Sequence, residues 1–186
     1  MTDKPTVNRY SPSVRVLHWL TAALVFAALI VGFALANALA DRIVLLAVHK
    51  VVGALILVIT IVRIANRVRR RTPAMPSTVG RWERRVVLGS EVAFYALLLA
   101  QPLLGWSMLS AAGVPVTVGP IALPPIAPVD AGLYALLRNG HSVLAYALVA
   151  LIAAHVSAVL LHAVTLRDGM LARMTARRWS TAGSRR

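Results

Sequence analysis

The stretch GHSVLAYALVALIAAHVSAVLLH, residues 140–162, is an almost unbroken apolar run that carries three of the five histidines of the chain. His141 and His155 are fourteen residues apart, close to four helical turns, so both rings leave one helix face about 21 Å apart. His162 lies seven residues further along this stripe. Since the hydrocarbon core of a bilayer is about 30 Å thick, a spanning helix would hold the first two histidines at different depths. This spacing suits two prosthetic groups stacked across a membrane.

The composition of the chain also favours a membrane setting. Hydrophobic residues make up 59% of its 186 residues, charged residues only 14%, and the mean hydropathy is +0.74. Soluble domains rarely have this composition. The formal net charge of +14 does not indicate nucleic acid, because the basic residues flank apolar segments. The absence of cysteine excludes disulfides, iron–sulfur clusters, thiolate zinc sites and covalently attached haem.

Four apolar segments predict an all-α fold, an antiparallel four-helix bundle that spans the lipid bilayer as a single domain. The predicted helices cover about residues 16–40, 43–65, 86–109 and 133–166, followed by a basic tail at 167–186. Ala38-Leu39-Ala40 resembles a signal-peptidase site, but the apolar run before it is longer than in a signal peptide, so we expect a retained helix. The proline-rich segment 111–130 is too irregular to span and is expected to cap one membrane face.

The distribution of lysine and arginine orients the predicted helices. Seventeen of these residues fall in the N-terminal, middle-loop and C-terminal segments, and three fall on the other side: Arg42, Lys50 and Arg138. Cytoplasmic segments of membrane proteins are enriched in Lys and Arg. Both termini are therefore predicted to be cytoplasmic.

Four histidines sort into two pairs by their predicted depth. His18 and His155 fall in the cytoplasmic half of the membrane, and His49 and His141 fall in the outer half. Axial ligation of haem needs two imidazoles on opposite sides of a flat macrocycle, which facing helices supply. Zinc normally takes a third or fourth protein ligand, and no carboxylate accompanies either pair. Because ionisable residues inside a membrane are costly and usually functional, two matched pairs favour two haem sites.

Several of these residues have structural alternatives. A histidine taken singly is more simply explained as a ring that hydrogen bonds a neighbouring helix. His162 has no histidine at its predicted depth, so packing and a quinone contact both remain open. Arg42, Lys50 and Arg138 either hold haem propionates and attract an anion, or extend to the lipid interface. A haem-free helical scaffold or transporter would also fit the four apolar segments.

Short motifs follow one another along the chain in a characteristic order. They are RVLHW at 15–19, His49 with Gly53 and Arg63, Tyr95 with PLLGW at 102–106, and His141 with His155. In this order and at these spacings they resemble the bacterial cytochrome b561 family of dihaem, four-helix membrane cytochromes. The resemblance implies a bacterial inner-membrane protein with two haem b groups. It also implies that His18 and His155 bind one haem, and His49 and His141 the other.

Within this family the chain resembles superoxide oxidase, an enzyme that takes electrons from superoxide at the periplasmic face and passes them to ubiquinone. This likeness implies superoxide and quinone as small-molecule partners, with no protein partner required. The alternative is a cytochrome b subunit that relays electrons between a dehydrogenase or hydrogenase and quinone. The chain departs from its relatives at Glu91, where they often carry a histidine four residues before the tyrosine. We interpret Glu91 as a carboxylate that balances nearby arginines.

Overall fold

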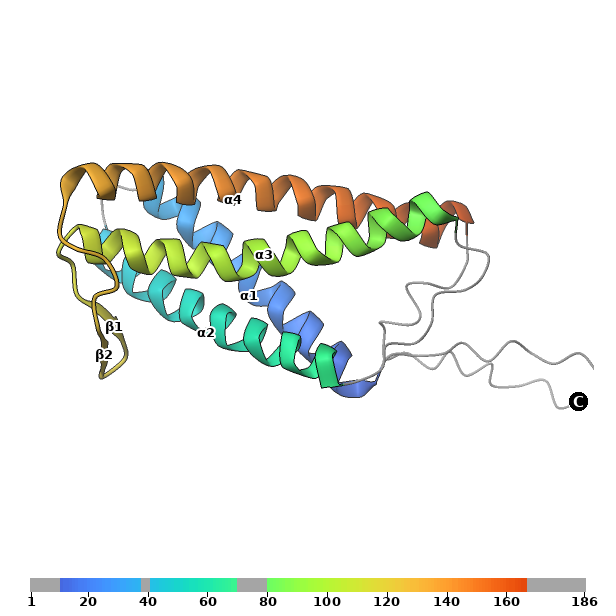
Figure 1. Ribbon diagram of the computed structural model, residues 1–186, viewed down its shortest axis with the longest axis horizontal. Helices are drawn as coiled ribbons and strands as arrows, with labels where there is room; N and C mark the ends of the chain where they lie inside the picture. Colours follow the sequence, from blue (N-terminus) through green and yellow to red (C-terminus); the bar gives the residue numbers. More distant parts are fainter. Residues whose placement is uncertain (1–10, 38–40, 70–79, 167–186) are drawn as a thin grey trace, which may run out of the picture.

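The computed structural model describes residues 11–37, 41–69 and 80–166, which form four long helices and one short hairpin (Figure 1). The elements in chain order are α1 (Pro12–Asn37), α2 (Arg42–Arg69), α3 (Arg81–Ala111), β1 (Val116–Val118), β2 (Ile121–Leu123), α4 (Ala131–Leu160) and the π-helical segment η1 (Leu161–Leu166). Each of the four long helices, the fourth counted through Thr165, is long and apolar enough to cross a membrane. The prediction of an all-α, four-helix membrane protein is confirmed.

The helix ends differ from the predicted bounds by a few residues. Helix α1 begins at Pro12, because proline in the first turn of a helix gives up no hydrogen bond. Helix α2 continues to Arg69 and α3 begins at Arg81, beyond the apolar runs that predicted them. Arginine is a good helix former, so a helix can extend past the apolar segment into the polar interface. The predicted helical residues 38–40 and the basic tail lie outside the described residues.

The segment between α3 and α4 is more regular than its proline content predicts. Strands β1 and β2 pair antiparallel, with Val118 opposite Ile121. Gly119, with φ 58°, and Pro120 form the two-residue turn between them. A positive φ followed by a proline, whose own φ is negative, matches a type II′ hairpin turn. We call this end of the bundle the hairpin end, and the opposite end, where α2 ends and α3 begins, the basic end.

Side chains of α3 hold the segment between α3 and α4 in place by hydrogen bonds. The indole Nε1 of Trp106 donates to the carbonyl oxygen of Pro124 at 3.0 Å, and the Ser110 hydroxyl accepts from the Ile126 amide at 3.2 Å. Asp130 then caps the first turn of α4 with its carboxylate. The connection therefore forms a fixed cap over one end of the helices, as the sequence predicted for this segment.

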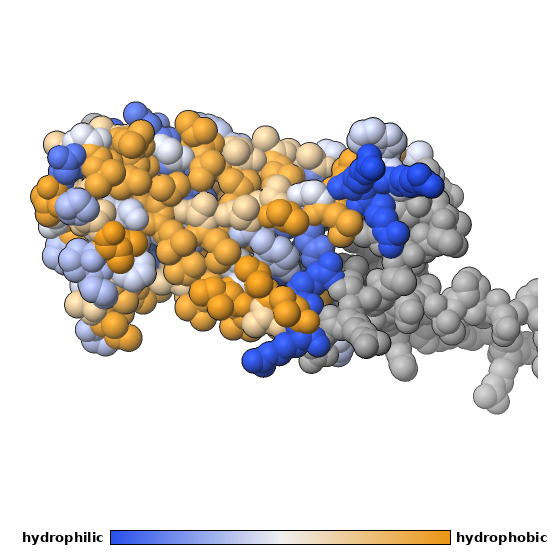
Figure 2. Space-filling model, viewed as in Figure 1, coloured by the Kyte–Doolittle hydropathy of each residue, from blue (hydrophilic) through white to orange (hydrophobic). Residues whose placement is uncertain are grey.

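The helices pack mainly with their neighbours in the chain. Helix α1 packs on α2, α2 on α3, and α3 on α4, whereas the backbone of α4 makes few close approaches to α1 and α2 (Figure 1). Helix α1 meets α4 through rings, with the centroids of Phe33 and Tyr146 5.7 Å apart. Apolar residues cover much of the visible surface, and strongly hydrophilic ones gather where α2 ends and α3 begins (Figure 2).

The bundle is built in three layers. Its small apolar core takes one residue from each helix: Val25, Ile56, Leu98 and Leu148. Seven residues away on each helix, towards the hairpin end, the chain carries Gly32, His49, Gly105 and His141. Seven residues away in the other direction it carries His18, Arg63, Glu91 and His155. Because seven residues make about two turns and about 10.5 Å of rise, two histidine-bearing layers flank one apolar layer. We call them the hairpin-end layer and the basic-end layer.

The orientation of the bundle stays a prediction, with the basic end in the cytoplasm and the hairpin end outside. Reporter domains fused after Arg71 and after Arg178 are expected to show cytoplasmic activity, and one inserted within residues 120–130 periplasmic activity. The physical reason is the excess of Lys and Arg in the segments at the basic end. The measurement is the ratio of alkaline phosphatase to green fluorescent protein signal at each position. An inverted ratio at these positions would contradict the orientation.

Candidate functional site

The first histidine pair lies in the hairpin-end layer. His49 of α2 and His141 of α4 face each other with ring centroids 6.2 Å apart and ring planes at 78°. A metal bound to one nitrogen of each ring, at about 2 Å, would place the two centroids roughly 6 Å apart. The rings therefore stand at the separation expected for two axial ligands of one iron.

The second pair repeats this arrangement in the basic-end layer. His18 of α1 and His155 of α4 have ring centroids 6.5 Å apart and planes at 59°. Aromatic rings flank both imidazoles edge-on, with Trp19 5.4 Å from His18 and Phe94 5.4 Å from His155. The structure thus brings together the two histidine pairs that the sequence predicts from depth alone.

Both pairs bridge helices whose backbones stand apart. Each pair joins α4 to α1 or α2, and these are the helices that α4 approaches least closely. A flat macrocycle needs such a wide seam, since closely packed helices leave no room between their side chains. The fourteen residues from His141 to His155 set the two sites about 21 Å apart along α4.

Buried ring nitrogens at the first pair have backbone groups beside them and leave the opposite nitrogens available to a metal. The Nδ1 atoms of His49 and His141 are buried and make no hydrogen bond within the described residues. The backbone of Ala28 lies beside the His49 ring, and that of Gln101 beside the His141 ring. A ring that binds metal through Nε2 carries its proton on Nδ1 and turns it to a backbone acceptor of this kind. The residues present therefore fit an imidazole-ligated haem.

Gln101 also ties the helix that carries His141 to α3. Its Nε2 donates to the backbone carbonyl oxygen of His141 at 3.1 Å. A hydrogen bond between side chain and backbone inside the bundle limits how far α4 can rotate against α3. The position of the His141 ring therefore depends on its own helix and on a neighbour.

Each histidine pair stands alone as a set of possible ligands. Within residues 11–37, 41–69 and 80–166, no three His, Asp or Glu side chains come together in a way that could hold a metal ion. Two neutral imidazoles are fewer ligands than a structural or catalytic zinc site uses. They are the usual number for a six-coordinate haem iron, whose other four ligands belong to the macrocycle.

Charged side chains make successive contacts between α2 and α3 beside the second histidine pair. The guanidinium carbon of Arg63 lies 5.6 Å from the centroid of the Tyr95 ring, and Arg63 interacts electrostatically with His18. One turn further out, Arg67 pairs with Glu91 through Nε–Oε1 at 2.7 Å and Nη2–Oε2 at 2.8 Å. This two-bonded pair confirms that Glu91 balances an arginine. Because both side chains are about one-third exposed, the pair links α2 to α3 more than it stabilises the fold.

The three predicted cations of the hairpin end fall into two groups. Arg42, in the first turn of α2, and Arg138, on α4, are exposed. Lys50 instead fastens the hairpin, since its Nζ donates to Thr117 Oγ1 at 3.3 Å and to the Pro115 carbonyl oxygen at 3.5 Å. The structure thus leaves Arg42 and Arg138 as the exposed cations at this end of the described chain. A contact of any of the three with a haem propionate stays a prediction.

His162 lies in η1, beyond His155, and is half-buried. It belongs to neither histidine pair. The sequence left open whether it packs or contacts a quinone, and its position near the basic end is compatible with both.

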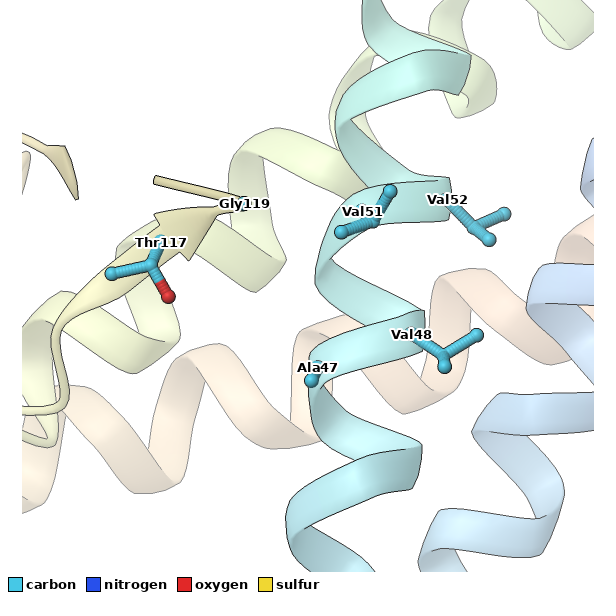
Figure 3. A pocket seen from close by; sticks show the side chains of 6 residues that line it. All are labelled: Ala47, Val48, Val51, Val52, Thr117 and Gly119. Carbon is cyan, nitrogen blue, oxygen red and sulfur yellow. The ribbon is translucent and has the colours of Figure 1, made fainter. Parts of the chain in front are cut away.

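Two grooves open on the surface of α2. The hairpin groove, about 400 Å³, lies between α2 and the hairpin and is lined by Ala47, Val48, Val51, Val52, Thr117 and Gly119. Figure 3 shows the two hairpin residues on one side of it and the α2 residues on the other. The basic-end groove, about 380 Å³, lies between α1 and α2 and is lined by Ser13, Leu17, Val62, Ala65, Asn66 and Arg69. Only the second combines apolar walls with several side-chain hydrogen-bond donors.

Gly32 and Gln101 have no role in the sequence predictions, and Arg63 appears there only as a motif residue, yet all three lie beside the histidine pairs. A signal for two of them was present in the sequence. Gly32 is seven residues from the core residue Val25, and Arg63 is seven from Ile56. The same interval separates each of the four paired histidines from a core residue. Gln101 has no such spacing and could be found only from the packing of α3 on α4.

Comparison with known protein families supplies an independent finding. Residues 9–177 match the family model described as prokaryotic cytochrome b561. Among curated proteins, no sequence matches the chain. The matched range includes all four helices, the hairpin and both histidine pairs. The chain therefore belongs to the prokaryotic cytochrome b561 family.

Proposed function

We propose that this membrane haem b electron-transfer protein is a superoxide oxidase of the bacterial inner membrane. It would take electrons from superoxide at the hairpin end and deliver them to ubiquinone at the basic end. Two superoxide anions would each lose one electron and become dioxygen, and one quinone would gain two electrons and two protons to become a quinol. The observation that carries this proposal is the presence of two matched histidine pairs at opposite ends of one bundle.

His49 and His141 are the proposed ligands of one haem b, and His18 and His155 of the other. When bound, each haem supplies one-electron chemistry at its iron. The chain supplies two facing imidazoles at each site and holds them on helices. The apolar core layer between the sites keeps water out of the region that separates them. Both haem sites would therefore keep a fixed geometry and a fixed distance.

The proposed superoxide entrance is the hairpin end. Arg42 and Arg138 are exposed there, and Lys50 adds a third positive charge although its Nζ also holds the hairpin. Superoxide is a small monoanion, and a cationic surface raises the rate at which such an anion arrives. The same cations are the proposed partners of the haem propionates, because Arg and Lys form charge-assisted hydrogen bonds with carboxylates.

The proposed quinone site is the basic-end groove. A quinone head is a flat, mostly apolar ring with two carbonyl acceptors, so its site needs apolar walls and a few hydrogen-bond donors. Leu17 and Val62 supply apolar walls, and Asn66 and Arg69 supply donors. Leu17 directly precedes His18, which sets the groove beside the second histidine pair. His162 is a further candidate contact for the quinone at this end.

The purified protein is expected to be reduced rapidly by superoxide, and a ubiquinone analogue is expected to reoxidise it. Stopped-flow absorption at the haem bands measures both steps, and superoxide dismutase added beforehand should abolish the first. Asn66→Leu is expected to slow reoxidation roughly tenfold, the effect of losing one hydrogen bond to a bound ligand, without changing the reduction rate. The matched control is Asn37→Leu. Asn37 is an exposed asparagine at the end of α1 that lies away from the basic-end groove.

Two outcomes would replace this proposal. Slow reduction by superoxide together with fast reduction by a dehydrogenase or hydrogenase would favour the relay subunit. Purified protein without a Soret band would contradict both functions and favour a haem-free scaffold. If Asn66→Leu and Asn37→Leu reoxidised at the same rate, the quinone would bind elsewhere.

A further inference from the structure

Each histidine ring of the hairpin-end layer rests on a glycine of another helix. A Cβ atom at Gly32 of α1 would lie 3.1 Å from Cε1 and 3.6 Å from Nδ1 of His49. A Cβ atom at Gly105 of α3 would lie 3.4 Å from Cε1 and 3.7 Å from Nδ1 of His141. The same edge of the imidazole therefore meets a glycine at both positions. At Gly32 even a methyl group would force the ring to shift.

Each glycine lies four residues after the backbone group beside the ring. In an α-helix, the N–H of residue 32 points at the carbonyl of residue 28, and that of residue 105 at the carbonyl of residue 101. The His49 ring lies beside the backbone of Ala28 and the His141 ring beside that of Gln101, although neither Nδ1 makes a hydrogen bond within the described residues. A carbonyl oxygen has a second lone pair that can accept from an imidazole N–H. A glycine four residues later leaves the approach to that lone pair open.

This contact is not a general property of the helical glycines in the described chain. Gly89, on α3 near the basic end, would place a Cβ atom with nothing within 4 Å. The basic-end layer carries Arg63 and Glu91 beside its histidines and has no glycine. The contact between a histidine ring and a glycine therefore occurs at one of the two histidine pairs and not at the other.

We propose that Gly32 and Gly105 are positioning residues. They hold the rings of His49 and His141, the proposed ligands of the hairpin-end haem, against α1 and α3, and we call this contact the glycine seat. This inference rests on the proposed ligation of that haem by His49 and His141. A seated ring cannot rotate freely about its bond to iron, so the two glycines fix the 78° angle between the ring planes. With iron on Nε2, they would also leave each Nδ1–H room to turn to a backbone carbonyl, and such outer contacts tune the ligand and the metal. The glycines would thereby set the electronic properties of one haem.

Gly32→Ala in the full-length protein tests the proposal. The low-spin iron signal in electron paramagnetic resonance depends on the angle between the axial imidazole planes. We expect this signal to shift for the hairpin-end haem, together with its midpoint potential, while the basic-end haem keeps both values. Gly105→Ala should cause at most a small shift, since its Cβ atom would lie 3.4 Å from the ring, which is close to ordinary van der Waals contact. Gly89→Ala is the matched control and should change neither haem.

The basic-end haem serves as an internal control for folding, because it binds only if the bundle has formed. Selective loss of the hairpin-end haem in Gly32→Ala would support the seat, because the retained haem shows that the bundle has formed. If Gly32→Ala gave no folded protein, the bulkier Gly105→Val would decide by the same comparison with Gly89→Val. Spectra and potentials equal to those of Gly89→Ala would overturn the seat.

His49→Ala, prepared in parallel, tests the proposed haem ligation separately from the proposed role of the glycines. Loss of one haem in His49→Ala together with unchanged spectra in both glycine variants would overturn the seat and leave the ligation standing. Retention of both haems in His49→Ala would overturn the ligation itself, and the seat with it.

Discussion

Purified His49→Ala and His141→Ala proteins are each expected to contain one haem b in place of two, with the hairpin-end haem lost and the basic-end haem kept. His18→Ala and His155→Ala should give the opposite result. The reason is that each iron would have two protein ligands, on helices whose backbones are not closely packed, so one imidazole alone holds the macrocycle weakly. Haem quantification by the pyridine haemochrome method gives the number per chain, and redox titration shows which haem remains.

His162→Ala provides the control for the ligation experiment. It removes an imidazole from α4's π-helical end, one that belongs to neither pair, and should leave two haems. Loss of a haem in His162→Ala alone would show that the proposed pairing is wrong. Loss of both haems from any single substitution would require a separate check that the bundle folds, for example by circular dichroism.

The rate of haem reduction by superoxide is expected to fall steeply as salt concentration rises. A cationic entrance can speed the arrival of a small anion by about 10-fold or more, and salt screens its field over about 8 Å at physiological ionic strength. Neutralising Arg42 or Arg138, each by glutamine, should slow the same step several-fold at low salt and have little effect at high salt. Stopped-flow reduction at several ionic strengths measures the difference.

Arg84→Gln is the matched control for the salt experiment, because Arg84 is an exposed helical arginine at the opposite end of the bundle. Its reduction rate should equal that of the unchanged protein. Lys50→Gln should be interpreted only after its haem spectrum proves intact, since Lys50 follows His49 and also holds the hairpin. A reduction rate that responds neither to salt nor to Arg42→Gln or Arg138→Gln would contradict the steering argument.

The number and order of the helices could be predicted because hydropathy responds to the length of an apolar run. The ends could not, since hydropathy falls at the first arginines whereas the helix continues through them, to Arg69 in α2 and from Arg81 in α3. The hairpin was missed for a related reason. Its strands have three residues each and lie among prolines, so they carry no alternating pattern long enough to detect.

The histidine pairs could be predicted because depth along a spanning helix follows from sequence position. The direction in which each side chain leaves its helix could not, because helices that are apolar nearly all round give no polar face to orient them. The engagement of Lys50 with Thr117 depends on that direction, as does the contact of Gly32 with the His49 ring. Both appear only when the helices are packed together.

The apolar core layer also sets the distance between the two histidine pairs. Leu148 lies midway between His141 and His155, and the distance between the two rings is counted in whole turns of α4. A single residue inserted in this interval would turn everything beyond it by about 100° and point one imidazole away from its partner. The gap between the two sites can therefore grow or shrink only in steps of roughly a turn, and every helix that contributes to a site must change by the same step. A change of side chain within the layer would therefore disturb the two sites far less than a change of its length.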